Sequence, residues 1–324
     1  MKAPDKGQRG IALIVVLLVV SILVALTVQL NYGTRSDLYE AANFSDGIRL
    51  TYIAKSGFNF GVVRLLDDET VQDTLTDAWA DSSAISDESK ELFSDGGFEV
   101  SVEDESGKIP INRLVQGTAV NQFIRDMLIR LLKEPPFSLG PEQAEAVVNA
   151  MKDWMDTDSD VTGAGAENDH YRSLPISYDA KNGPLDSLDE LLMIKGVTEQ
   201  MYYGTEESPG LRHLLTLYGD GKININTAPR QILRVLAPEI TDEMAEHMDA
   251  VRREPGRDLS NPQWYRQVSG MGAVGINSLF ITTSSDYFRI TATGYFGRMR
   301  ERVSGVVKRD LPKKTVKLIG WKVQ

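Results

Sequence analysis

The sequence predicts an α+β fold in which a helical block interrupts a set of strands. A long stretch with helical spacing follows an apolar run near the N-terminus, and alternating apolar residues then indicate strands in residues 97–112 and again from residue 287 onward. Helical patterns fill the chain between these two strand regions. Strands on both sides of a helical block favour an all-α domain inserted into an α+β domain.

The N-terminal apolar run, Ile11–Val28, contains no charged residue. As a helix it would span about 27 Å, close to the hydrocarbon thickness of a bilayer. Lys2, Lys6 and Arg9 precede it, so we expect the short N-terminus in the cytoplasm and the large remainder across the inner membrane.

Three interpretations of this run compete. A cleaved secretory signal has a shorter apolar core and small residues near its end, which Leu26–Gln29 lacks. A plain single-span anchor needs no processing at all. The third interpretation is a precursor cut between Gly10 and Ile11, because a charged leader ending in glycine before an unbroken apolar helix resembles the type IV pilin-like class.

Pilin-like proteins mostly carry glutamate at the fifth position after the cut, where its carboxylate meets the new N-terminal ammonium group of a neighbouring subunit. Counted from Ile11, that position is Val15, and no acid occurs between Ile11 and Asn31. Without this carboxylate, the N-terminal ammonium group of a subunit ahead would be buried and unpaired, which is costly. Such a subunit is therefore expected to have no subunit ahead of it. Val15 therefore predicts a place at the tip of a filament, or no place in a filament.

Element by element, the long helix should continue through Arg35–Leu66, loosened at Gly33 or Gly47, and Gly57 and Gly61 should allow close packing. Residues 71–97, rich in acids and serines, should form an irregular stretch with a short helix. Apolar residues in Gly97–Asn112 then alternate as in a hairpin that turns at residues 105–107. Further helices are predicted at Gln122–Leu132, Pro141–Met155, Leu185–Ile194, Pro229–Leu236 and Glu243–Arg253, and further strands at Tyr287–Thr293, Val303–Lys308 and Val316–Val323.

Charge is unevenly distributed over a chain whose formal net charge is −11. Residues 141–220 carry 16 acids against 5 lysines and arginines, whereas the residues from Gly297 onward are basic. The acidic middle argues against nucleic acid and for cations as partners. Because the chain has no cysteine, disulfides and thiolate metal sites are excluded.

The acidic segment Asp153–Asp169 predicts a Ca²⁺ site. Asp156, Asp158 and Asp160 alternate, and Glu167 stands at the twelfth place counted from Asp156, as carboxylate ligands do in a Ca²⁺ loop.

The match to an EF-hand is incomplete, since Val161 replaces the usual glycine and no clear helix pattern follows Glu167. A different loop fits better, in which Gly163 and Gly165 make the turn and Asn168 and Asp169 add oxygen ligands. The alternative is a solvated acidic loop, although its six carboxylates would repel one another without a cation.

Other motifs predict little chemistry. Gly270–Gly275 matches a dinucleotide-binding pattern but follows no strand, and Leu188–Val197 looks like a helix-hairpin-helix with too few basic residues to hold DNA. The three histidines stand in no catalytic motif, so we expect no enzyme.

Taken together, these features resemble the minor pseudopilin K family of type II secretion. The resemblance is carried by the Gly10–Ile11 junction, Val15, the acidic segment and the Leu185–Val197 hairpin, and also by Gly221–Pro229 (GKININTAP), Ser284–Gly294 (SSDYFRITATG) and Trp321. It implies a pilin-like fold, a long helix on a small antiparallel sheet, with an inserted helical domain of helix-hairpin-helix or SAM-like packing. The implied divisions are 1–10 (leader), 11–32 (membrane and filament helix), 33–112 (pilin-like helix and first strands), 113–283 (inserted domain) and 284–324 (C-terminal strands).

The resemblance also implies a function. Prepilin peptidase would cut after Gly10 and methylate Ile11, and the chain would join minor pseudopilins I and J at the tip of a periplasmic pseudopilus built from the major pseudopilin. Secreted proteins are further candidate partners. The family's Ca²⁺ ligands would correspond first to Asp156, Asp158, Glu167 and Asp169, then to Asp160 and Asn168. The main rival is a single-span receptor or adhesin with a Ca²⁺-stabilised domain, and a DNA-uptake component is more remote.

Overall fold

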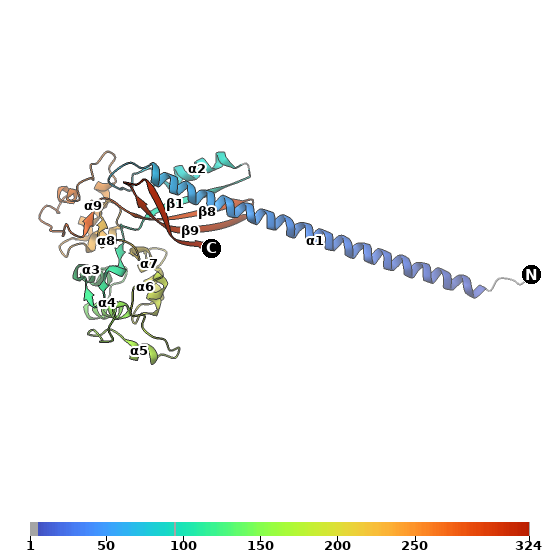
Figure 1. Cartoon of the computed structure of the whole chain (residues 1–324), viewed down its shortest axis with the longest axis horizontal. Helices are drawn as coiled ribbons and strands as arrows, with labels where there is room; N and C mark the ends of the chain where they lie inside the picture. The colour runs from blue at the N-terminus through green and yellow to red at the C-terminus, as the bar shows by residue number, and fades with distance from the viewer. Residues whose placement is uncertain (1–5, 94, 324) are drawn as a thin grey trace, which may run out of the picture.

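The computed structural model describes residues 6–93 and 95–323. Helix α1 (Lys6–Asp67) is its longest element, and its N-terminal part extends away from the rest of the molecule (Figure 1). The predicted loosening at Gly33 or Gly47 is wrong, because α1 runs through both glycines without a break. Each glycine costs about 1 kcal/mol in a helix interior, which a long helix with many good formers tolerates.

A four-stranded antiparallel sheet packs against the C-terminal part of α1. Its strand order is β1-β8-β9-β10, with β1 at Gly96–Asp104, β8 at Tyr287–Phe296, β9 at Met299–Asp310 and β10 at Thr315–Val323. The strand from the first half of the chain thus pairs with β8 and completes a sheet whose other three strands come from the end of the chain. The predicted pilin-like architecture, a long helix on a small antiparallel sheet, is confirmed.

The contact between α1 and the sheet is close because two glycines lie one helical turn apart. A Cβ atom on Gly57 would lie 2.8 Å from the ring of Phe98, and one on Gly61 would lie 2.8 Å from Ile290 Cγ2. Apolar residues of α1, of the facing strands, of helix α2 (Ser82–Leu92) and of the segment before α2 form one core around them: Ile53, Ala54, Phe58, Leu65, Trp79, Ile85, Phe98, Val100, Val102, Phe288, Ile290, Ala292, Val303 and Val307. Helix α2 lies beside β1.

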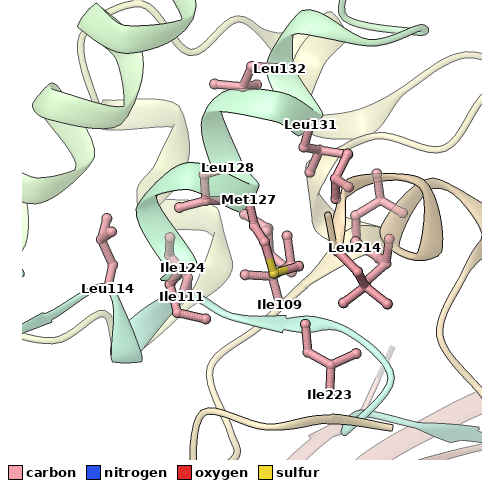
Figure 2. Packing of buried hydrophobic residues seen from close by; sticks show 14 of the residues in the cluster. Ile109, Ile111, Leu114, Ile124, Met127, Leu128, Leu131, Leu132, Leu214 and Ile223 are labelled. Carbon is pink, nitrogen blue, oxygen red and sulfur yellow. The ribbon is translucent and has the colours of Figure 1, made fainter. Parts of the chain in front are cut away.

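Between β1 and β8 the chain forms a helical block with a core of its own. Figure 2 shows α3 (Gln122–Lys133), whose residues Ile124, Met127 and Leu128 lie over Ile109 and Ile111. The other helices are α4 (Pro141–Met155), α5 (Asn168–Arg172), α6 (Glu199–Tyr203), α7 (Leu211–Leu214), α8 (Arg230–Val235) and α9 (Asp242–Arg252), with 3₁₀ turns η1 (Ile111–Arg113), η2 (Leu188–Met193) and η3 (Trp264–Gln267).

The predicted hairpin at Gly97–Asn112 is wrong in its second half. Its first strand is β1, and Phe98, Val100 and Val102 share the buried face as predicted. The returning residues form β2 (Ile109–Pro110), which pairs in parallel with β5 (Leu215–Thr216) instead of with β1. The reason is burial: Ile109 and Ile111 are apolar anchors of the helical block and are fully buried there.

Further short strands complete the block and its junction with the sheet. They are β3 (Val115–Gln116) with β4 (Ala119–Val120), and β6 (Ile223–Asn224) with β7 (Ile281–Thr282). The segment predicted as a helix-hairpin-helix consists of η2, a turn at Gly196 with φ of 85°, and α6.

Buried polar side chains join the block to the sheet. Asn224 donates hydrogen bonds to Asp104 Oδ2 (3.2 Å) and Ser285 Oγ (2.8 Å), and Arg309 forms an ion pair with Asp73. All five residues are less than a tenth exposed. We call this group the junction network.

Candidate functional site

The acidic loop follows directly from the end of α4. Asp153 lies in the last turn of that helix and Asp156 is its C-cap residue, so the helix fixes both carboxylates at the mouth of the loop. The chain then returns to α5, with Glu167 at the N-cap position. A short helix therefore does follow Glu167, contrary to the expectation from the sequence pattern.

Asp153 organises the loop from within. Its carboxylate is fully buried and accepts backbone hydrogen bonds from Thr162 (3.1 Å) and Ala166 (3.0 Å). Gly165 lies so close that a Cβ atom there would be 2.1 Å from Asp153 Oδ2. The predicted role of Gly165 in the turn thus has a steric reason, since any side chain would displace the carboxylate that holds the loop.

Three of the predicted ligands come together in this loop. One carboxylate oxygen from each of Asp156, Asp158 and Glu167 lies within 4.8 Å of the other two. Asp156 and Glu167 are buried and Asp158 is half-buried. Among the described residues, Asp156 Oδ1 and both carboxylate oxygens of Glu167 have no hydrogen-bond partner.

The electrostatics of this group reflect its burial. Desolvation, and then the nearby Asp153 and Asp156, raise the pKa of Glu167 to about 7. Desolvation also raises the pKa of Asp156, although Lys152 donates a hydrogen bond to its other oxygen. Buried carboxylate oxygens without donors are expensive unless something positive faces them.

The donor set therefore fits a hard divalent cation. Carboxylate oxygens from a helix end and a loop are the ligands that Ca²⁺ takes, at 2.3–2.6 Å and with flexible geometry. Asp156, Asp158 and Glu167 would hold the ion, which would supply the positive charge that these oxygens lack.

The other predicted ligands lie outside this group. Asp160 and Asp169 are exposed, and Asn168 Oδ1 accepts a hydrogen bond from Ala180 N (2.8 Å). Their role as ligands stays a prediction.

Two polar residues of this site were missed by sequence reasoning. Asp153 is one. Asn182 is the other: its Nδ2 donates to Asp158 O (3.0 Å), and its buried Oδ1 has no partner among the residues that the structure describes. The Asn182-Gly183 pair, a turn signal with φ of 49° at Asn182, was the available clue.

The membrane helix is a second functional feature. The apolar window at the start of α1 has a mean hydropathy of 3.3, and none of its residues is buried against the rest of the chain. Val15 is 52% exposed. An apolar helical segment that packs against nothing else in its own chain fits a single-pass membrane anchor.

Comparisons with known proteins point to one family. The family model of the type II secretion system protein K matches residues 107–206, which include the acidic loop. The type II secretion system protein K of Pseudomonas aeruginosa is 25% identical over 94% of this chain and 90% of its own length. The chain is therefore similar to type II secretion system protein K over nearly its whole length.

Further comparisons point to the same family. Protein K of Aeromonas hydrophila is 24% identical over 97% of this chain and 96% of its own length. A chain in the crystal structure of the GspK-GspI-GspJ complex from the type 2 secretion system of enterotoxigenic Escherichia coli shares the fold. It gives a TM-score of 0.69 at 15% identity, over 88% of this chain and 99% of that one. These likenesses agree with the resemblance to the minor pseudopilin K family drawn from the sequence.

Proposed function

We propose that this chain acts at the tip of the type II secretion pseudopilus, where it joins the minor pseudopilins I and J and initiates assembly. The observation that carries the partners is the shared fold with a chain of the GspK-GspI-GspJ complex over nearly its whole length. The export of proteins across the outer membrane would then begin from this complex.

Two features of the chain support a place at the tip. The helical block lies beyond and to one side of the end of α1 that is remote from the N-terminus (Figure 1), and its bulk would obstruct subunits stacked above it. Val15 also leaves the apolar helix without a carboxylate to neutralise the N-terminal ammonium group of a subunit ahead of it.

We also propose that prepilin peptidase cuts between Gly10 and Ile11 and methylates the new N-terminus, with the sheet and helical block in the periplasm. N-terminal sequencing of protein extracted from membranes distinguishes this from a plain anchor. A start at Ile11 with a methylated amine supports processing. An intact Met1 would favour the single-span receptor or adhesin instead.

Calcium has a structural role in this proposal. The ion would join Asp156 at the end of α4 to Glu167 at the start of α5, and so hold the loop between them in one conformation. The orphaned oxygens of these two residues support the assignment.

Co-purification tests the proposed function. The full chain, extracted in mild detergent with its own minor pseudopilins I and J, should elute with both as one complex. The Val15→Glu variant should still bind them but initiate fewer pseudopili. Elution of the wild-type chain alone would contradict the proposal.

A further inference from the structure

One edge strand of the sheet, β1, is covered by a helix, whereas the other, β10, is not. On the β1 side, α2 covers the edge with serine hydroxyls: Ser89 Oγ accepts from Phe98 N (3.1 Å) and donates to Phe98 O (2.9 Å). Ser86 Oγ accepts from Val100 N (3.1 Å). These bonds satisfy backbone groups that an edge strand would otherwise offer to another chain.

The β10 side has no such cover. Within the described part of the chain, β10 pairs with β9 on one side only. Four of its apolar residues are also at least 40% exposed: Leu318, Ile319, Trp321 and Val323. A nine-residue edge strand with an apolar surface is a template for a further strand.

The charge of this edge restricts which strand can pair there. Lys317 and Lys322 are exposed, and neither has a charged partner among the described residues. Although the whole chain carries −11, its residues from Gly297 onward hold nine lysines and arginines against Glu301 and Asp310. A second copy of β10 would bring like charges together, whereas an acidic strand would be attracted.

The position of β10 indicates where the partner comes from. The ring of Trp321 packs edge-on against Phe58 of α1, with centroids 4.8 Å apart. The open edge therefore lies alongside the helix that would pack into the filament. A neighbouring subunit whose N-terminal helix lies beside α1 brings its own folded domain next to this edge.

We propose that the free edge of β10 is the docking strand for an acidic extended segment of a neighbouring minor pseudopilin, I or J. This inference rests on the proposed function and adds the surface that makes the contact. Backbone hydrogen bonds along β10 would supply affinity. Lys317 and Lys322 would make the edge specific for an acidic segment.

Charge reversal with a matched control tests the proposal in the full-length chain. Lys317→Glu combined with Lys322→Glu should weaken binding to minor pseudopilins I and J at least tenfold. The control, Lys313→Glu combined with Lys314→Glu, changes the net charge equally in the turn before β10, where the lysines pair with Asp310 and Glu69. It should bind like the wild type.

A cross-link identifies the occupant. Because the chain has no cysteine, Lys317→Cys gives a single attachment point for a benzophenone label. We expect a cross-link to pseudopilin I or J, and far less from Glu99→Cys on β1, across the sheet.

Unchanged affinity of the Lys317→Glu, Lys322→Glu variant, or a cross-link only to a second copy of this chain, would overturn the docking strand and leave the proposed function standing. Failure of the wild-type chain to bind I and J would instead overturn the proposed function, and this inference with it.

Discussion

A carboxylate oxygen of Asp156 and one of Glu167 lie within 4.8 Å of each other in the acidic loop, although both side chains are buried. Burial raises the pKa of both groups, and the nearby charges of Asp153 and Asp156 raise the pKa of Glu167 further. The arrangement is favourable only when a proton or a cation shares the site. This is the physical basis of the calcium assignment.

Replacing Glu167 with glutamine should lower the affinity for Ca²⁺ by at least about tenfold, because one charged ligand is lost. Isothermal titration of the full-length chain in detergent measures it. Asp179→Asn is the matched control: this exposed carboxylate pairs with Arg172 and lies outside the group of three, so its loss should change the affinity little. Equal losses in both variants would contradict the assignment of Glu167 as a ligand.

Arg309 and Asp73 should stabilise the junction network as a pair. Arg309→Met leaves Asp73 buried without its charge partner, which costs about 3–5 kcal/mol. Adding Asp73→Asn should recover part of that loss, since the uncompensated charge is removed. Urea unfolding of the two single variants and the double variant gives the coupling free energy. If the two changes in the free energy of unfolding simply add in the double variant, the ion pair has no coupling free energy.

Glu105 should make the protein sensitive to acid. Burial opposes ionisation of this residue, but Lys108 and Arg289, each 2.8 Å from Oε1, lower its pKa from 4.5 to about 2. The folded state keeps the charge while the unfolded state takes up a proton. The stability that Glu105 provides is therefore complete above about pH 4.5 and is lost as the pH falls toward 2.

Glu105→Gln should accordingly cost about 3–5 kcal/mol at pH 7, and the difference from the wild type should shrink below pH 4.5. Unfolding free energies measured across this pH range check it. Exposed Glu99, 3.7 Å from Arg300, is the control, and Glu99→Gln should give a small difference at every pH. A gap between Glu105→Gln and wild type that stayed constant down to pH 2 would refute the lowered pKa.

Much of this fold follows from local patterns in the sequence. The 3.6-residue spacing of apolar residues located α3 and α4 almost to the residue, and alternation located β8, β9 and β10. Those signals suffice where an element buries a single face against one core. They fail around β2, where Ile109 and Ile111 alternate like the residues of a hairpin strand but pack in the core of the helical block.

The candidate site divides in the same way. Carboxylate spacing along the chain located Asp156, Asp158 and Glu167, since a loop that closes on itself brings such residues together. Asn182 comes from a different loop, 24 residues after Asp158, and no local pattern connects the two. The partner of Asp104 is likewise distant: Asn224 lies 120 residues further along the chain.

Gly61 should be required for the close contact between α1 and the sheet. Gly61→Ala would place a methyl group 2.8 Å from Ile290 Cγ2 and should destabilise the packing of α1 on the sheet by about 1–3 kcal/mol. Gly47→Ala meets nothing within 4 Å and should stabilise the helix by about 0.5–1 kcal/mol. Thermal unfolding followed by circular dichroism compares them. Two variants shifted in the same direction would contradict the proposed packing.

The position of this chain in the assembled pseudopilus tests the central claim most directly. Gold-labelled antibody against the helical block, imaged by electron microscopy on purified pseudopili, would reveal that position. The account predicts a label at one end of each filament, accompanied by minor pseudopilins I and J. Labels distributed along the shaft would contradict it.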